Sequence, residues 1–127
     1  ELVVWDPGVG VLVGGGLVAH RRIPQAIDGQ IRGWWQALDE LGRLPIVQVI
    51  PGHGAPGSSQ MLGEQKAYLQ ALLDAVQSAL QAGISLGRLA DGPAQGPWVH
   101  WDGYPEQHRQ NLHTVYLELE RGGLERP

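Results

Sequence analysis

Apolar residues along this chain follow two periods, one typical of strands and one typical of helices. Two short apolar runs, residues 2–5 and 11–13, are rich in β-branched side chains and are joined by Asp-Pro-Gly-Val-Gly, a natural hairpin connection. A third run, residues 46–50, stops at Pro51 and predicts another strand. Together these runs predict a small β-sheet.

Three longer segments place apolar residues at helical spacing. Residues 28–42 predict a helix capped by Asp28. Residues 60–82 predict a longer helix, capped by Ser58 or Ser59 just before it. The last segment predicts a helix over residues 105–120. No repeat or linker divides the chain, so all 127 residues are expected to form a single unit of mixed α and β type.

Glycine is unusually frequent, with 19 residues of 127. The glycines cluster at residues 8–16, 52–57 and 83–103, between the apolar segments. Glycine lets the backbone adopt positive φ or approach a ligand closely, so these clusters predict turns near a site. The third cluster is also rich in proline and predicts a loop with at most a short helical turn.

Composition narrows the class of protein. A hydrophobic content of 43% and a charged content of 17% are those of a soluble globular protein. The net charge is −4, and the basic residues are scattered apart from Arg21-Arg22, so no nucleic-acid partner is expected. No apolar run approaches the roughly 20 residues that span a bilayer, so no membrane partner is expected either. The cellular compartment is left open.

Several catalytic motifs are missing from the sequence. There is no cysteine and no Gly-x-Ser-x-Gly elbow, which excludes disulfides, thiolate ligands and two common nucleophiles. The triple glycine at residues 14–16 is not followed by Lys-Ser/Thr, so it is not a phosphate-binding loop. No catalytic residue is therefore assigned from motifs.

Five histidines remain as candidate functional residues. His108 and His113 are five residues apart, about 140° around a helix, so they are not expected to bind one metal together. His100 lies in Trp-Val-His-Trp-Asp-Gly-Tyr, where packing or a hydrogen bond is the expected role. His53 lies in Pro-Gly-His-Gly at the end of a predicted strand. Its spacing fits both a ligand site beyond the sheet edge and a turn histidine bonded to the backbone.

The ordered combination of these segments resembles a known family. The stretch from Trp5 to Gly54, "WDPGVGVLVGGGLVAHRRIPQAIDGQIRGWWQALDELGRLPIVQVIPGHG", resembles the second half of a metallo-β-lactamase-superfamily hydrolase. It is most similar to the zinc metallohydrolases of quinoprotein and sulfur-oxidation systems, and more distantly to glyoxalase II. The ending "HRQNLHTVYLELE" is similar to the C-terminal helix of that branch. The resemblance implies an α/β fold, strictly α+β, with one small sheet and helices on its outer face: half of an αββα sandwich.

Two departures limit what the resemblance implies about the site. The family's His-x-His-x-Asp-His motif, which supplies most of its zinc ligands, is absent from these residues. The family aspartate that often bridges two metals aligns with Gly16. By resemblance only His53 is a metal ligand. Because a catalytic zinc needs three protein ligands, the chain alone is expected to hold zinc weakly or not at all.

Three functions are compatible with these observations. The first is the C-terminal portion of a zinc hydrolase that cleaves esters, thioesters or amides with a metal-bound water and is inactive as an isolated chain. The second is a metal-free, non-catalytic binding or scaffold module derived from that fold, which Gly16 favours. The third, independent of the resemblance, is a small ligand-binding domain that uses a tryptophan-rich surface of Trp34, Trp35, Trp98 and Trp101.

The predicted strands also suggest a partner. Their apolar residues need cover on both faces of the sheet, and the helices over 28–42 and 60–82 can cover only one. The chain opens in an apolar run without an initiator methionine, as if cut from a longer protein. We therefore expect a homodimer, or a complex with a missing N-terminal half on another chain.

Overall fold

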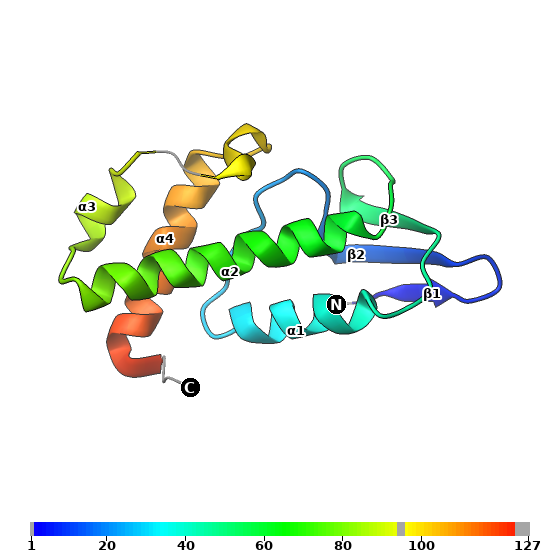
Figure 1. The fold of residues 1–127 in the computed structure, drawn as a ribbon, viewed down its shortest axis with the longest axis horizontal. Helices are drawn as coiled ribbons and strands as arrows, with labels where there is room; N and C mark the ends of the chain where they lie inside the picture. The colour runs from blue at the N-terminus through cyan, green and yellow to red at the C-terminus, as the bar shows by residue number, and fades with distance from the viewer. Residues whose placement is uncertain (1, 94–95, 124–127) are drawn as a thin grey trace.

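The structure is a computed structural model that describes residues 2–93 and 96–123. Its sheet has three strands in the order β1 (Val4–Asp6), β2 (Val11–Ala19) and β3 (Gln48–His53). β1 is antiparallel to β2, whereas β3 is parallel to it. A small sheet covered by helices on one face, in a mixed α/β fold, confirms the predicted fold class (Figure 1).

Two strands are longer than their apolar runs predicted. β2 continues through the triple glycine, which was expected to form a turn, and shifts register on both sides of Gly15. β3 continues through Pro51 to His53. Because β3 lies at the edge of the sheet, the missing N–H of Pro51 does not interrupt a central ladder. The histidine is therefore part of the strand itself.

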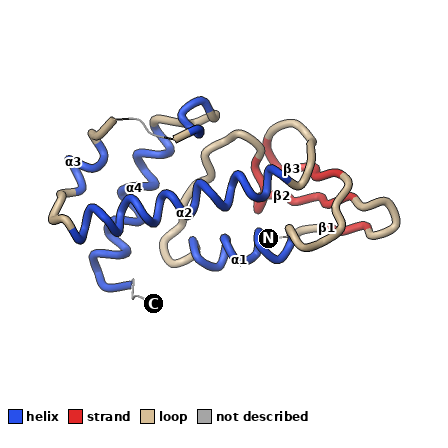
Figure 2. Tube along the Cα trace, in the orientation of Figure 1, coloured by secondary structure: helices blue, strands red, loops and turns tan. Residues whose placement is uncertain are grey.

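The three predicted helices are confirmed as α1 (Ile31–Leu41), α2 (Gln60–Gln81) and α4 (Glu106–Glu118). The loop predicted before α4 instead contains two short helical segments. The further short elements are α3 (Leu86–Ala90), the 3₁₀ turn η1 (Pro97–His100) and the π-helical turn η2 (Leu119–Gly123). α3 and α4 lie at one end of the molecule and the strands at the other, while α2 runs between the two ends and α1 lies beside the sheet (Figure 2).

The predicted caps at Asp28 and Ser59 are wrong, whereas Ser58, the other cap predicted for α2, accepts a 3.2 Å hydrogen bond from Gln60 N–H through its hydroxyl. α1 begins after Gln30 and α2 after Ser59, and neither of these residues makes a capping hydrogen bond through its side chain. Both have right-handed helical φ and ψ, whereas a capping residue needs an extended backbone to turn its side chain onto the first turn. The Asp28 carboxylate instead accepts a 2.8 Å bond from Arg121 near the C-terminus.

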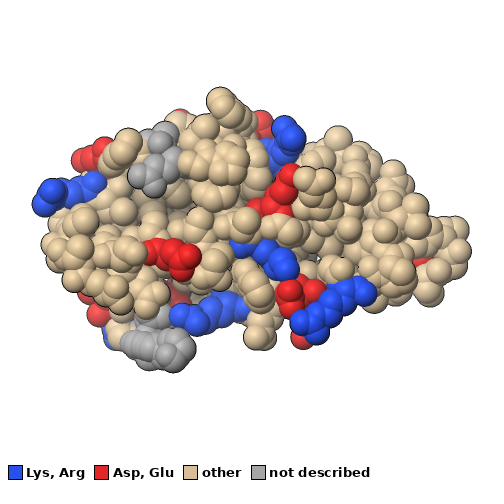
Figure 3. Space-filling model, viewed as in Figure 1, with Lys and Arg blue, Asp and Glu red and all other residues tan. Residues whose placement is uncertain are grey.

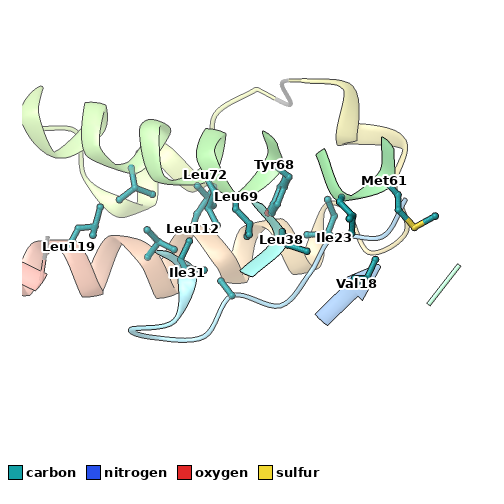
Figure 4. Packing of buried hydrophobic residues seen from close by; sticks show 14 of the residues in the cluster. Val18, Ile23, Ile31, Leu38, Met61, Tyr68, Leu69, Leu72, Leu112 and Leu119 are labelled. Carbon is teal, nitrogen blue, oxygen red and sulfur yellow. The ribbon is translucent and has the colours of Figure 1, made fainter. Parts of the chain in front are cut away.

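One face of the sheet packs against α1 and α2, and this is the outer face in the sandwich that the resemblance implied. Leu12 of β2 and Val49 of β3 are opposite one another and fully buried. The core continues along α2 toward α4 and includes Val18 at one end and Leu119 at the other (Figure 4). All four tryptophans of the proposed ligand-binding surface pack against this core and are partly buried, so their apolar rings help to close it. The members are Trp34, Trp35, Trp98 and Trp101.

Among the described residues, two polar side chains are completely buried in the core, and both hold backbone segments in place. The Gln65 amide of α2 accepts a hydrogen bond from Ala19 N–H at 2.9 Å and donates to Leu17 O at 3.1 Å, which fixes the irregular end of β2. The Asn111 amide of α4 does the same for the segment after β2. It accepts from Ala26 N–H at 2.9 Å and donates to Pro24 O at 2.7 Å.

The opposite face of the sheet is apolar and uncovered. Val4, Val13 and Ile50 form one cross-strand row and are 51%, 38% and 38% exposed. Six of the eight large hydrophobic side chains exposed in the described residues belong to the strands or to the turns beside them. The charged side chains in Figure 3 gather over the helices and leave the strand end nearly uncharged. The exposed apolar surface is thus concentrated on the sheet and not on the helices.

None of the helices in the described residues is both long enough and apolar enough to cross a membrane.

Candidate functional site

His53 lies at the carboxyl end of β3, where β3 runs parallel to β2. Its backbone pairs with Ala19, and its carbonyl oxygen accepts from His20 N–H at 2.9 Å. The imidazole is 43% exposed. Ligand sites in sheets with parallel strands tend to lie beyond the carboxyl ends of those strands, so the position is suited to a ligand. The predicted placement of His53 at a strand end is confirmed.

The glycines beside His53 are required by the backbone. A Cβ at Gly52 would overlap the carbonyl oxygen of Gly15 on the neighbouring strand. Gly54 has φ of +97°, and a Cβ there would overlap the carbonyl oxygen of His20. Close approach of β2 and a tight turn therefore explain both glycines without any ligand.

Arg22 covers one face of the imidazole of His53. The guanidinium nitrogen Nη1 is 3.2 Å from Nδ1 and 3.2 Å from Nε2. The two ring nitrogens direct their in-plane hydrogen-bonding positions away from each other, so one atom cannot lie in line with both. Nη1 therefore lies over the ring face, and the arginine makes a stacking contact that leaves the ring edge accessible.

Asp102 also reaches His53, and the sequence did not predict this. The backbone of Asp102 pairs with the segment after β2, since Ile23 N–H donates to Asp102 O and Asp102 N–H donates to Arg21 O, each at 2.9 Å. Its Oδ2 then lies 3.5 Å from His53 Nε2. That distance is at the limit for a hydrogen bond, and both side chains are exposed, so the pair contributes little to stability.

The signal that could have located Asp102 is the aromatic stretch around it. Trp98 and Trp101 pack against Tyr68 of α2, with ring centroids 5.6 Å and 6.1 Å from that of the tyrosine. Aromatic anchors of this kind fix a loop to a helix even when the loop lacks regular structure. The partner segment is about 80 residues away in sequence and no pattern in the chain indicates it.

The other histidines are not assembled around His53. His20 places Nδ1 2.6 Å from the carbonyl oxygen of Ala55, and a carbonyl only accepts, so Nδ1 carries a proton. His108 is half-buried and its Nδ1 is 2.8 Å from the hydroxyl of Tyr68. His100 and His113 are exposed.

The residues that the structure describes do not fit a zinc centre by themselves. Across residues 2–93 and 96–123, no group of three or more His, Asp or Glu side chains could hold a metal ion. The imidazole of His53 and the carboxylate of Asp102 are two donors, whereas a catalytic zinc takes three from the protein. Gly16, at the bridging position that the resemblance implied, offers no side-chain donor.

A pocket of about 340 Å³ opens beside His53. Arg22 and Gln107 supply polar groups, Trp34 supplies part of the apolar wall, and Gly16 and Gly52 are also among the lining residues. The volume is in the range of small-molecule sites. The pocket can therefore hold a small ligand next to the imidazole.

Comparison with known proteins supports the fold. No protein-family model matches the sequence, and no curated protein matches it either. A metallo-β-lactamase family protein from Thermus thermophilus has a similar structure, with a TM-score of 0.64 and 21% sequence identity. The similarity covers 95% of this chain and 40% of that protein, so the chain spans less than half the length of the structure it matches. The chain thus has a metallo-β-lactamase-like fold.

Proposed function

We propose that residues 1–127 form the C-terminal portion of a zinc-dependent hydrolase domain that cleaves an ester, thioester or amide. The single observation that carries the proposal is the position of His53. The imidazole lies at the carboxyl end of β3 with its ring edge accessible, beside a 340 Å³ pocket, in a chain with a metallo-β-lactamase-like fold. His53 is the one zinc ligand that this portion contributes, and the other ligands come from outside the chain.

The uncovered face of the sheet supports the same proposal. Val4, Val13 and Ile50 form an apolar row that no described helix covers. A second sheet, supplied by the remainder of such a domain, would bury this row and bring further ligands toward His53. Each Å² of apolar surface buried is worth roughly 25 cal/mol before the costs of association. In the isolated chain, two copies are expected to pair through the same face.

Hydrolysis by the complete product of the reading frame that encodes this chain tests the proposal. We expect turnover of an aryl ester or a thioester that falls at least 100-fold in His53→Ala. His113→Ala is the matched control, because His113 is an exposed histidine on α4 and its loss should leave turnover unchanged. The isolated chain should show no turnover, since it has too few ligands to hold zinc. Turnover that is equal in wild type and His53→Ala would contradict the proposal.

A further inference from the structure

A second hollow lies away from His53, between α3, α4 and the C-terminal part of α2. It has a volume of about 410 Å³, in the range of small-molecule sites. Ile84, Leu89 and Leu112 give it an apolar lining, and Arg88, His108 and Arg109 contribute polar groups. α3 and α4, which flank it, lie at the opposite end of the molecule from the strands (Figure 1). We call it the α3–α4 groove.

The hydrogen bonds behind this groove fix the orientation of the Asn111 amide. Ala26 N–H can only donate and Pro24 O can only accept, so Oδ1 faces the first and Nδ2 faces the second. Nδ2 also lies 2.9 Å from the hydroxyl oxygen of Tyr68 and donates to it. The hydroxyl therefore accepts from Asn111 and keeps its own proton for another partner.

That partner is His108, whose Nδ1 is 2.8 Å from the Tyr68 oxygen. Burial raises the pKa of the Tyr68 hydroxyl, which stays protonated and donates to Nδ1. A nitrogen that accepts carries no proton, so the neutral ring of His108 carries its proton on Nε2. Burial also lowers the pKa of His108, in agreement with the neutral form. The ring thus presents a fixed N–H donor on the side away from Tyr68.

The cations of the groove differ in their availability. Arg109 is neutralised by Asp91, at 2.8 Å, and also donates to Ala90 O at 3.0 Å. Arg88 is exposed on α3, and no carboxylate among the described residues pairs with its guanidinium. The α3–α4 groove therefore combines one available positive charge, one oriented neutral donor and an apolar lining.

We propose that the α3–α4 groove binds a small monocarboxylate with an apolar body. The carboxylate accepts hydrogen bonds from the Arg88 guanidinium and from His108 Nε2–H, and the apolar body lies on Ile84, Leu89 and Leu112. A planar carboxylate matches the fork of donors on arginine, and a single available cation matches a single negative charge. The site is separate from the pocket of His53 and does not depend on a metal.

Titration with sodium hexanoate, followed by amide chemical shifts in ¹H–¹⁵N spectra, tests the proposal. We expect saturable shifts at the amides of Leu89 and Leu112, with affinity on the order of millimolar for a ligand of this size. Hexan-1-ol, which has the same apolar body without the charge, should bind at least tenfold more weakly. The charge of Arg88 should account for that difference.

Two variants complete the test. Arg88→Gln removes the charge from an exposed position and should weaken hexanoate binding at least tenfold without unfolding the protein. Arg32→Gln, the matched control, removes an exposed arginine on α1 and should leave binding unchanged. Equal binding of hexanoate by Arg88→Gln and wild type would overturn the proposal, as would shifts that do not saturate or that fall outside the groove.

Discussion

Replacement of Asn111 by alanine should destabilise the protein more than any exposed substitution on the same helix. Asn111 is fully buried and its amide satisfies two backbone groups of the segment after β2. In Asn111→Ala, Ala26 N–H and Pro24 O lose those partners while they remain buried. Tyr68 loses one hydrogen bond but keeps the bond to His108.

The magnitude follows from the number of groups left unpaired. Each buried polar group without a partner costs about 1–3 kcal/mol, so two groups cost about 2–6 kcal/mol. A domain of this size is stable by about 5–15 kcal/mol, so the loss is a large part of the total free energy of unfolding. The variant should fold at low temperature and unfold at a much lower urea concentration than wild type.

Equilibrium unfolding in urea, followed by tryptophan fluorescence, measures this loss. Trp98 and Trp101 pack on Tyr68 and should report on the region directly. Gln110→Ala is the matched control, because Gln110 is an exposed neighbour on α4 and its substitution should change stability by less than about 0.5 kcal/mol. A loss below about 1 kcal/mol in Asn111→Ala, at an unchanged m-value, would refute the reasoning.

Three further predictions concern the turn after β3, the half-buried His108 and the uncovered face of the sheet. Gly54→Ala should destabilise the protein by at least about 1 kcal/mol because Gly54 has a positive φ. Gly63→Ala, at an exposed position of α2, should stabilise it by about 0.5–1 kcal/mol, and equal urea midpoints for the two variants would contradict this. Burial lowers the pKa of His108 in the folded state below its usual 6.5, so the histidine stabilises the fold fully above pH 6.5 and this contribution is lost as the pH falls toward the folded-state pKa. The urea midpoint should therefore fall less between pH 8 and pH 5 in His108→Asn than in wild type, and equal declines in the two proteins would contradict this. Wild type should self-associate at micromolar concentration in light scattering while Val13→Lys moves toward the 13.8 kDa monomer, and a wild-type monomer that binds no hydrophobic dye would refute the open-face account.

The sequence predicted the long helices and the histidine at the strand end because both follow from the pattern of neighbouring residues. The apolar spacing predicted α1, α2 and α4, and the abrupt end of an apolar run placed His53 at the edge of the sheet. The register shifts around Gly15 could not be predicted, since they depend on the close fit of two strands that meet only in the fold.

The surroundings of His53 were not predictable for a related reason. Arg22 stacks on the ring because a turn at Arg21, with φ of +60°, redirects the chain after β2. Asp102 arrives through a backbone pairing between segments about 80 residues apart. Gln65 and Asn111, which fix the backbone segments around the site, are fully buried in helices, although glutamine and asparagine are usually exposed. Local patterns carry no signal for such long-range polar contacts.

The zinc content of the complete product of the reading frame, after dialysis against a metal-free buffer, is the measurement that tests the central claim most directly. The account predicts at least one zinc per protein in wild type and in the control His113→Ala, and well below one in His53→Ala, because His53 is the ligand that this portion contributes. The isolated chain of 127 residues should hold well below one zinc. A zinc content that His53→Ala leaves unchanged, or a stoichiometric zinc in the isolated chain, would contradict the account.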